Sequence, residues 1–126
     1  MHNRRNDYRH PFAPEDRLRV ELTSARGSCV IGEIADLSIG GLAYEGDVAF
    51  PLVPDEQVTA HFAIPHGLRR FAIPATVVHD RGDRFGLHFL PLEDDEAQED
   101  RDKALWVFLL DEQRRERRRL RGERAG

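Results

Sequence analysis

The sequence is poor in the features that would assign it at once to a secreted or a membrane class. Cys29 is the only cysteine, so no disulfide can form within the chain, and a reducing cytoplasm is the simplest expectation. The longest uninterrupted apolar run, residues 104–110, is far shorter than the roughly 20 residues that a membrane-spanning helix needs. Residues 1–5 also lack the apolar stretch of a signal peptide. We therefore expect a cytoplasmic protein without a membrane span.

A strong charge of one sign is also absent. The net charge is −4, which argues against general binding to nucleic acids, although the distribution of charge matters more than its sum. The hydrophobic share is 40% and the charged share is 33%, so we expect a compact core with a heavily charged segment outside it. A chain of 126 residues predicts one domain, which should bury roughly two-thirds of its unfolded surface.

What the chain does contain is a series of short alternating segments. Leu18, Val20 and Leu22, for example, alternate with polar side chains, which is the period of a half-buried strand. Residues typical of turns separate these segments from one another. We predict strands on this basis at residues 18–22, 30–37, 42–45, 58–64, 71–77 and 85–89. Short strands at this spacing are typical of an antiparallel sandwich or barrel.

The last third of the chain changes from acidic to basic. Residues 93–102 hold seven acidic side chains against one arginine, and such a segment suits a helix N-terminus because of the helix macrodipole. Leu105, Phe108 and Leu109 follow at helical spacing and should pack on the β-rich body. The turns beyond about Arg115 lack an apolar face and should fray. Residues 1–16 are polar and contain Pro11 and Pro14, so we expect irregular backbone there. The chain thus divides into a flexible arm at 1–16, a β-rich body at 17–92, and a helix and tail at 93–126.

Two short segments carry most of the chemistry. Residues 4–9 read Arg-Arg-Asn-Asp-Tyr-Arg, and residues 36–41 read Asp-Leu-Ser-Ile-Gly-Gly. Guanidinium groups match phosphates and the O6/N7 edge of guanine, and their flat faces stack on bases. A carboxylate can accept hydrogen bonds from the ring N–H and the amino group of guanine. Together the two segments suit a ligand that carries both guanine and phosphate.

The same two segments resemble the signature of the PilZ domain family. Arg5-x-x-x-Arg9 and Asp36-x-Ser38-x-x-Gly41 match that signature at every defined position, and the resemblance covers roughly residues 4–110. It implies a mainly β fold, a six-stranded antiparallel barrel with a C-terminal α-helix. It also implies a receptor for the bacterial second messenger cyclic di-GMP. We expect the ligand to order the Arg4–Arg9 arm, and this change to relay the signal to an unidentified partner protein.

The resemblance implies a role for each residue of the two segments. Arg5 and Arg9 would contact phosphates and guanine, and Asp36 would accept from a guanine edge. Ser38 would hydrogen-bond the ligand or fix the turn. Arg4 would add a third guanidinium, which favours two stacked ligand molecules per chain. The remaining members of the expected ligand site are Gly40 and Gly41, where a Cβ would block a close approach.

Other classes of function remain open from the sequence. The chain can be a PilZ-like protein-interaction module with little ligand affinity, its arm a solvated tail and its Asp-x-Ser-x-x-Gly segment an ordinary hairpin turn. It can also be a nucleic-acid binder that uses its basic tail, although interspersed glutamates and the scarcity of aromatic residues argue against this reading. The tail arginines are Arg114, Arg115, Arg117, Arg118, Arg119, Arg121 and Arg124.

Neither catalysis nor a metal centre is expected. Ser38 lacks the glycine-flanked elbow of a serine nucleophile, and nothing near it in the sequence identifies a base. His61, His79 and His88 lack the close spacing of a zinc motif, so we predict surface histidines. We therefore predict a binding protein that needs no cofactor and performs no reaction.

Overall fold

The computed structural model describes residues 8–46, 55–65, 69–81 and 84–125. Its strands and helices are β1 (His10–Pro11), a 3-10 helix (Pro14–Asp16), β2 (Leu18–Ser24), β3 (Cys29–Leu37), β4 (Gly41–Gly46), β5 (Gln57–Ile64), β6 (Arg69–Arg81), β7 (Arg84–Phe89) and α2 (Asp95–Ala125). The six predicted strands correspond to β2–β7, and the helix predicted for the last third corresponds to α2.

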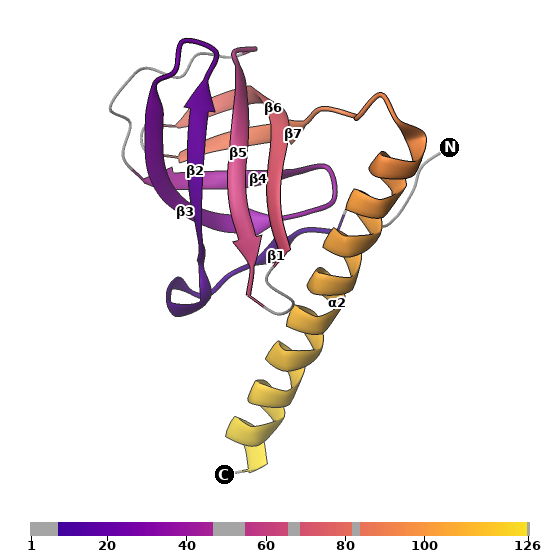
Figure 1. The fold of residues 1–126 in the computed structure, drawn as a ribbon. Helices are drawn as coiled ribbons and strands as arrows, with labels where there is room; N and C mark the ends of the chain where they lie inside the picture. The colour runs from indigo at the N-terminus through magenta and orange to yellow at the C-terminus, as the bar shows by residue number, and fades with distance from the viewer. Residues whose placement is uncertain (1–7, 47–54, 66–68, 82–83, 126) are drawn as a thin grey trace.

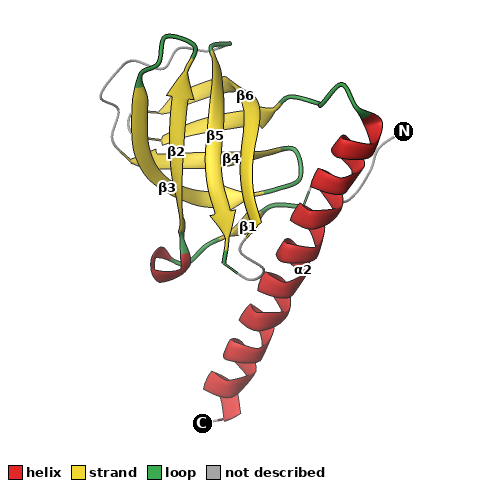
Figure 2. Ribbon diagram, viewed as in Figure 1, coloured by secondary structure: helices red, strands yellow, loops and turns green. Residues whose placement is uncertain are grey.

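The six long strands close into an antiparallel barrel (Figures 1 and 2). Neighbouring strands follow the order β3-β2-β5-β6-β7-β4, and β4 then pairs with β3 to complete the ring. The expected mainly β fold, a six-stranded barrel with a C-terminal helix, is therefore confirmed. The two-residue β1 lies outside this ring and pairs with β3.

The alternating apolar residues fill the barrel. Val20 and Leu22 of β2 are fully buried, as is Tyr44 of β4. Leu105 and Leu109 of α2 are also fully buried, so α2 packs on the barrel through the apolar face that the sequence predicts. Burying a side chain of this size contributes roughly 1.5–3 kcal/mol to stability.

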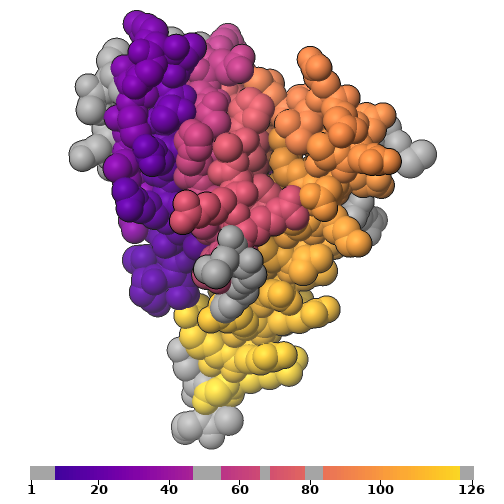
Figure 3. Space-filling model, viewed as in Figure 1, coloured from indigo at the N-terminus to yellow at the C-terminus, as the bar shows by residue number. Residues whose placement is uncertain are grey.

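Helix α2 runs without a break to Ala125 and extends beyond the barrel (Figures 1 and 3). The prediction that its turns beyond about Arg115 fray is therefore not met. Ion pairs one turn apart, Arg114 with Asp111 and Arg115 with Glu112, support the helix up to Arg115, and an ion pair of Arg119 with Asp16 at 3.0 Å supports the turns beyond it. Within the described residues, no helix has both the length and the apolar character to cross a membrane.

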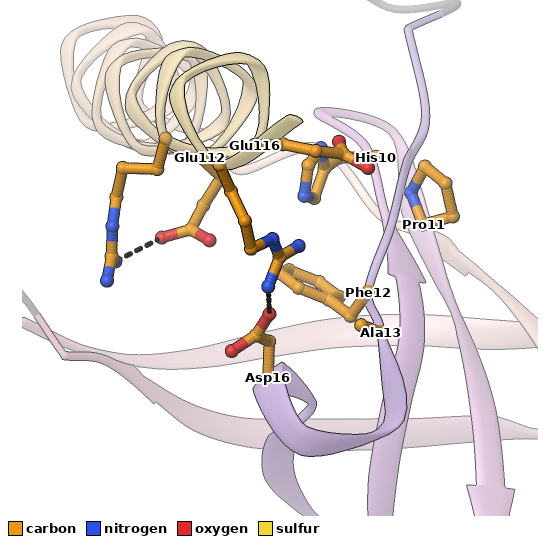
Figure 4. Close-up of a pocket in the computed structure, with 9 residues that line it drawn as sticks. His10, Pro11, Phe12, Ala13, Asp16, Glu112 and Glu116 are labelled. Carbon is orange, nitrogen blue, oxygen red and sulfur yellow. Dashed lines mark hydrogen bonds and ion pairs between the residues drawn. The ribbon is translucent and has the colours of Figure 1, made fainter. Parts of the chain in front are cut away.

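The segment that precedes β2 is held against α2. Phe12 is buried with its ring 6.3 Å from that of Phe108, and Tyr8 meets the edge of Trp106 at 6.1 Å. Figure 4 shows this segment facing α2 across a small cleft. The sequence predicts irregular backbone throughout residues 1–16, which is wrong for β1 and for the 3-10 helix. Both are too short to show a period, and aromatic packing on α2 stabilises the segment around β1.

A charged contact also joins the segment before β2 to the C-terminal part of α2. Arg119 of α2 donates a hydrogen bond to the carboxylate of Asp16 at 3.0 Å, and this contact raises the pKa of Arg119. Residues 1–7, which include Arg4 and Arg5, lie outside the described residues. The flexible arm and the domain boundaries therefore stay predictions.

Candidate functional site

A bulge at the end of β3 directs the Asp36 side chain. The pairing of β3 with β4 shifts register between Ile34 and Asp36, and both Ile34 and the intervening Ala35 are buried. A bulge of this kind bends a strand and turns the following side chain to a new direction. On the other edge of β3, Asp36 pairs with Pro11 of β1, which brings the arm over the end of the strand.

Two arginines share the Asp36 carboxylate. Arg9 donates from Nη1 to Oδ1 at 3.0 Å, and Arg84 at the start of β7 donates from Nη2 to Oδ2 at 3.4 Å. The Asp36 side chain is only 16% exposed, whereas those of Arg9 and Arg84 are 59% and 49% exposed. The guanidinium groups therefore remain open to an anionic ligand while one carboxylate fixes their position.

Ser38 holds the turn that follows β3. Its backbone N–H and its hydroxyl both donate to the carbonyl oxygen of Gly41, at 2.9 and 3.2 Å. The side chain is 2% exposed, so the hydroxyl is committed to the turn in this structure. A role for Ser38 in contacting a ligand stays a prediction.

The two glycines of the turn stand in different surroundings. A Cβ on Gly41 would collide with the carbonyl oxygen of Leu87 in the neighbouring β7, so the fold itself requires glycine at this position. A Cβ on Gly40 would meet nothing within 4 Å. Neither glycine has a positive φ, unlike Gly27 and Gly46. The close approach of the Leu87 backbone, rather than a special backbone conformation, therefore explains the glycine at position 41. The space in front of Gly40 is open.

That space belongs to an open cavity of about 340 Å³ between the turn, the end of β7 and the first turns of α2. The volume lies at the lower end of the range of about 300–1,000 Å³ that is usual for small-molecule sites. The lining residues from the arm and the barrel are Arg9, Ser38, Ile39, Gly40, His88, Phe89 and Pro91, and those from α2 are Gln98, Arg101 and Asp102.

Arg101 is the cation that α2 places in this cavity. Its Nη1 donates to the carbonyl oxygen of Leu90 at 3.1 Å, and its guanidinium lies 5.9 Å from the centre of the Phe89 ring. The residue is 6% exposed, its buried Nε has no hydrogen-bond partner, and burial lowers the pKa of the guanidinium. The Asp102 carboxylate lies 3.9 Å from this Nε and offsets part of the buried charge, and the guanidinium is the positive group that α2 contributes to the cavity lining.

The structure thus brings together five of the seven predicted site residues. Arg9, Asp36, Ser38, Gly40 and Gly41 lie at one end of the barrel, and Arg4 and Arg5 lie outside the described residues. Sequence reasoning missed two cations near them, Arg84 and Arg101. A signal for Arg101 was present, because it is the single arginine within the acidic residues 93–102. No comparable signal marks Arg84, which lies on β7 and reaches Asp36 of β3 across the intervening strand β4.

The other polar clusters give weaker evidence for a site. In the cleft between α2 and the segment after β1, Arg119 and Arg115 pair with Asp16 and Glu112, as the dashed lines in Figure 4 show. His61 shares a hydrogen bond with Thr23 at 3.1 Å. Among the described residues, no group of three or more potential metal ligands occurs.

Comparison with known proteins agrees with the fold. A family model described as the PilZ domain matches residues 3–104, which is most of the chain and contains both segments. The chain therefore belongs to the PilZ domain family, and the resemblance found from the sequence is confirmed. No match was found among curated proteins.

Solved structures of the family share the fold at low identity. The PilZ domain of CeSA from a cellulose-synthesizing bacterium is 24% identical, with a TM-score of 0.63, and the match covers 79% of this chain and 95% of that one. The PilZ domain of YcgR from Escherichia coli, solved with c-di-GMP, is 16% identical, with a TM-score of 0.70 and coverage of 90% and 94%. The c-di-GMP complex of MrkH from K. pneumonia is 19% identical, with a TM-score of 0.65, and this chain spans 56% of its length.

Proposed function

We propose that this protein is a receptor for cyclic di-GMP, which binds in the cavity beside Gly40 without chemical turnover. The observation that carries the proposal is the meeting of Arg9 and Asp36 at the rim of a cavity that Arg101 also lines. The matching solved domain of YcgR contains c-di-GMP, which supports the choice of ligand. The proposal places the protein in the cytoplasm, where a second messenger acts.

The charges around the cavity fit a ligand with guanine bases and phosphates. Arg9 and Arg101 can each form charge-assisted hydrogen bonds with a phosphate, and the exposed Arg9 guanidinium can also stack on a base. Asp36 would exchange one arginine contact for the N–H groups of a guanine edge. Its two arginine partners hold the carboxylate in place until the ligand arrives.

The arm offers a route by which binding reaches a partner protein. Arg9 stands between Tyr8, which contacts Trp106 of α2, and the buried His10 of β1. A ligand that draws Arg9 away from Asp36 would therefore act on residues that pack on α2. In the proposed relay, binding orders residues 4–9 and alters the surface that the arm and α2 present.

Competition binding would test the choice of ligand. Labelled cyclic di-GMP bound to the native chain should be displaced by unlabelled cyclic di-GMP at far lower concentrations than by GTP or GMP. The reason is that only the cyclic dinucleotide presents two guanines and two phosphates in one compact molecule. Equal displacement by all three nucleotides would reduce the cavity to a general phosphate site and contradict the proposal.

Arg101→Met should weaken binding of cyclic di-GMP by about tenfold, because a charge-assisted hydrogen bond to a phosphate is lost. The stability of the barrel should change by no more than about 1 kcal/mol, since an apolar side chain of similar length often replaces a buried charge at little cost. Lys103→Met is the matched control, because it removes one positive charge from the exposed side of the same helix. Equal affinities of the two variants would show that Arg101 does not contact the ligand.

The native chain should bind two stacked ligand molecules, and Arg4 is the residue that we connect with this number. Two stacked cyclic dinucleotides bring four phosphate charges together, and a further guanidinium offsets their repulsion. Calorimetric stoichiometry should be about two for the native chain and should fall toward one for Arg4→Leu, if charge is the cause. A native stoichiometry of one that Arg4→Leu leaves unchanged would remove this role from Arg4.

A further inference from the structure

The exposed side of α2 carries an ordered stripe, and one of its members, Asp100, accepts a hydrogen bond from Arg69 of β6 at 2.6 Å. Its members follow one another in alternating steps of four and three residues, which keeps them on one side of a helix. The side chains of this outer stripe are Glu96, Asp100, Lys103, Val107, Leu110, Arg114, Arg117 and Arg121. All of them except the half-buried Leu110 are exposed, and they lie opposite Leu105, Phe108 and Leu109.

The outer stripe is acidic at its start, apolar at its middle and basic at its end. Glu99 and Arg118 flank the two charged ends and extend the same pattern. A parallel pairing of two such helices would set acidic side chains against acidic ones at the first end and basic side chains against basic ones at the second end. An antiparallel pairing reverses this, because the acidic end of one helix meets the basic end of the other. The stripe is therefore complementary to itself in one orientation only.

We propose that α2 is the interface of an antiparallel homodimer, in which the outer stripes of two copies face each other. With the two-fold axis midway between Val107 and Leu110, Val107 of one copy meets Leu110 of the second copy. The same register places Arg121 opposite Glu96 of the second copy and Arg118 opposite Glu99 of the second copy. Apolar side chains then occupy the centre and charged pairs the rim, as in other protein interfaces.

The molecular surface beside the stripe can accommodate the α2 helix of a second copy. An open groove of about 430 Å³ runs along α2 at this point, and its apolar lining comes from Ile64, Ala104, Val107 and Phe108. A side chain from the middle of a second helix would be buried there. The helix itself is 31 residues long, or about 46 Å at the usual rise, and Figure 3 shows its C-terminal turns beyond the barrel. A second copy can therefore approach those turns from the outer side.

One contact in this register is unfavourable. Lys103 would stand opposite Arg114 of the second copy, so two positive charges approach each other. Asp111 lies 3.9 Å from Arg114 within the same chain and offsets part of this repulsion. Exposed ion pairs are individually weak, so the assembly depends on several of them together with the apolar centre. Its dimer fraction should therefore fall as salt is raised.

Charge reversal at matched positions tests the pairing. Sedimentation velocity of the full chain without nucleotide should report a dimer. The double variant Arg118→Glu/Arg121→Glu and the double variant Glu96→Arg/Glu99→Arg should each raise the dissociation constant by about tenfold or more. An equimolar mixture of the two variants should form a heterodimer as tight as the native dimer. In that mixture each reversed end faces an oppositely charged partner.

The control keeps the same change of net charge but leaves α2 intact. Arg19→Glu/Arg70→Glu reverses two exposed arginines on the barrel and should not affect the dimer. A native chain that is monomeric would overturn the proposal. So would a dimer that both reversals leave unchanged, or a mixture that fails to associate. None of these measurements contains a nucleotide, so their outcome is independent of the proposed receptor function.

Discussion

Gly41→Ala should destabilise the barrel by about 3 kcal/mol or more, whereas Gly40→Leu should change its stability by no more than about 0.5 kcal/mol. A Cβ on Gly41 is directed at the Leu87 carbonyl oxygen, which belongs to a paired strand and cannot move without breaking the pairing of β4 with β7. No atom lies within 4 Å of a Cβ on Gly40. For a domain of this size the loss at position 41 corresponds to a fall in melting temperature of about 10 °C or more.

Gly40→Leu, which should leave the stability of the barrel nearly unchanged, should instead weaken ligand binding. A leucine at position 40 fills part of the cavity and should lower the affinity for cyclic di-GMP by about tenfold or more. Thermal unfolding of each variant, with and without cyclic di-GMP, measures both effects. A Gly40→Leu protein that the ligand stabilises as much as the native chain would show that the ligand binds elsewhere.

Arg9→Ala should weaken cyclic di-GMP binding by about 1–3 kcal/mol, the range for a bidentate contact to a base, without unfolding the barrel. Asp36→Ala should do the same, because the guanine edge loses its acceptor and the two arginines lose the carboxylate that positions them. Neither Arg9 nor Asp36 belongs to the apolar core of the barrel.

The barrel offers a closely matched control for this pair. Arg26 is 78% exposed and lies 3.5 Å from the carboxylate of Glu56, which is 14% exposed, so its surroundings resemble those of Arg9 and Asp36. Arg26→Ala should leave calorimetric affinity unchanged. If Arg9→Ala lowered the melting temperature strongly while affinity stayed at the native value, its assigned role would be structural.

The sequence predicted the barrel and the helix well because their signals are local and repeated. Alternation at positions such as 18, 20 and 22 marks a strand by itself, and the spacing of Leu105, Phe108 and Leu109 marks the helical face that packs. The continuation of α2 past Arg115 escaped prediction. The contact of Arg119 with Asp16 supports these turns in place of an apolar face.

The arrangement of the site depended on the three-dimensional fold. Ala35 is buried beside Ile34 because a bulge interrupts the alternation, and no residue type in the sequence announces a bulge there. Arg101 stands out in the sequence as the single arginine among acidic residues, but its burial beside Phe89 follows only from the placement of α2 on the end of β7. The different duties of Gly40 and Gly41 become visible only when the position of Leu87 is known.

Hydrogen exchange with and without cyclic di-GMP tests the central claim most directly, because it reports both binding and its location. Ligand should protect backbone amides in residues 1–9, in the turn at 36–41 and in the first turns of α2 around Arg101. Amides in the rest of the barrel should exchange at unchanged rates. Protection confined to another surface, or no protection at saturating ligand, would contradict a cyclic di-GMP site formed by the arm, the turn and α2.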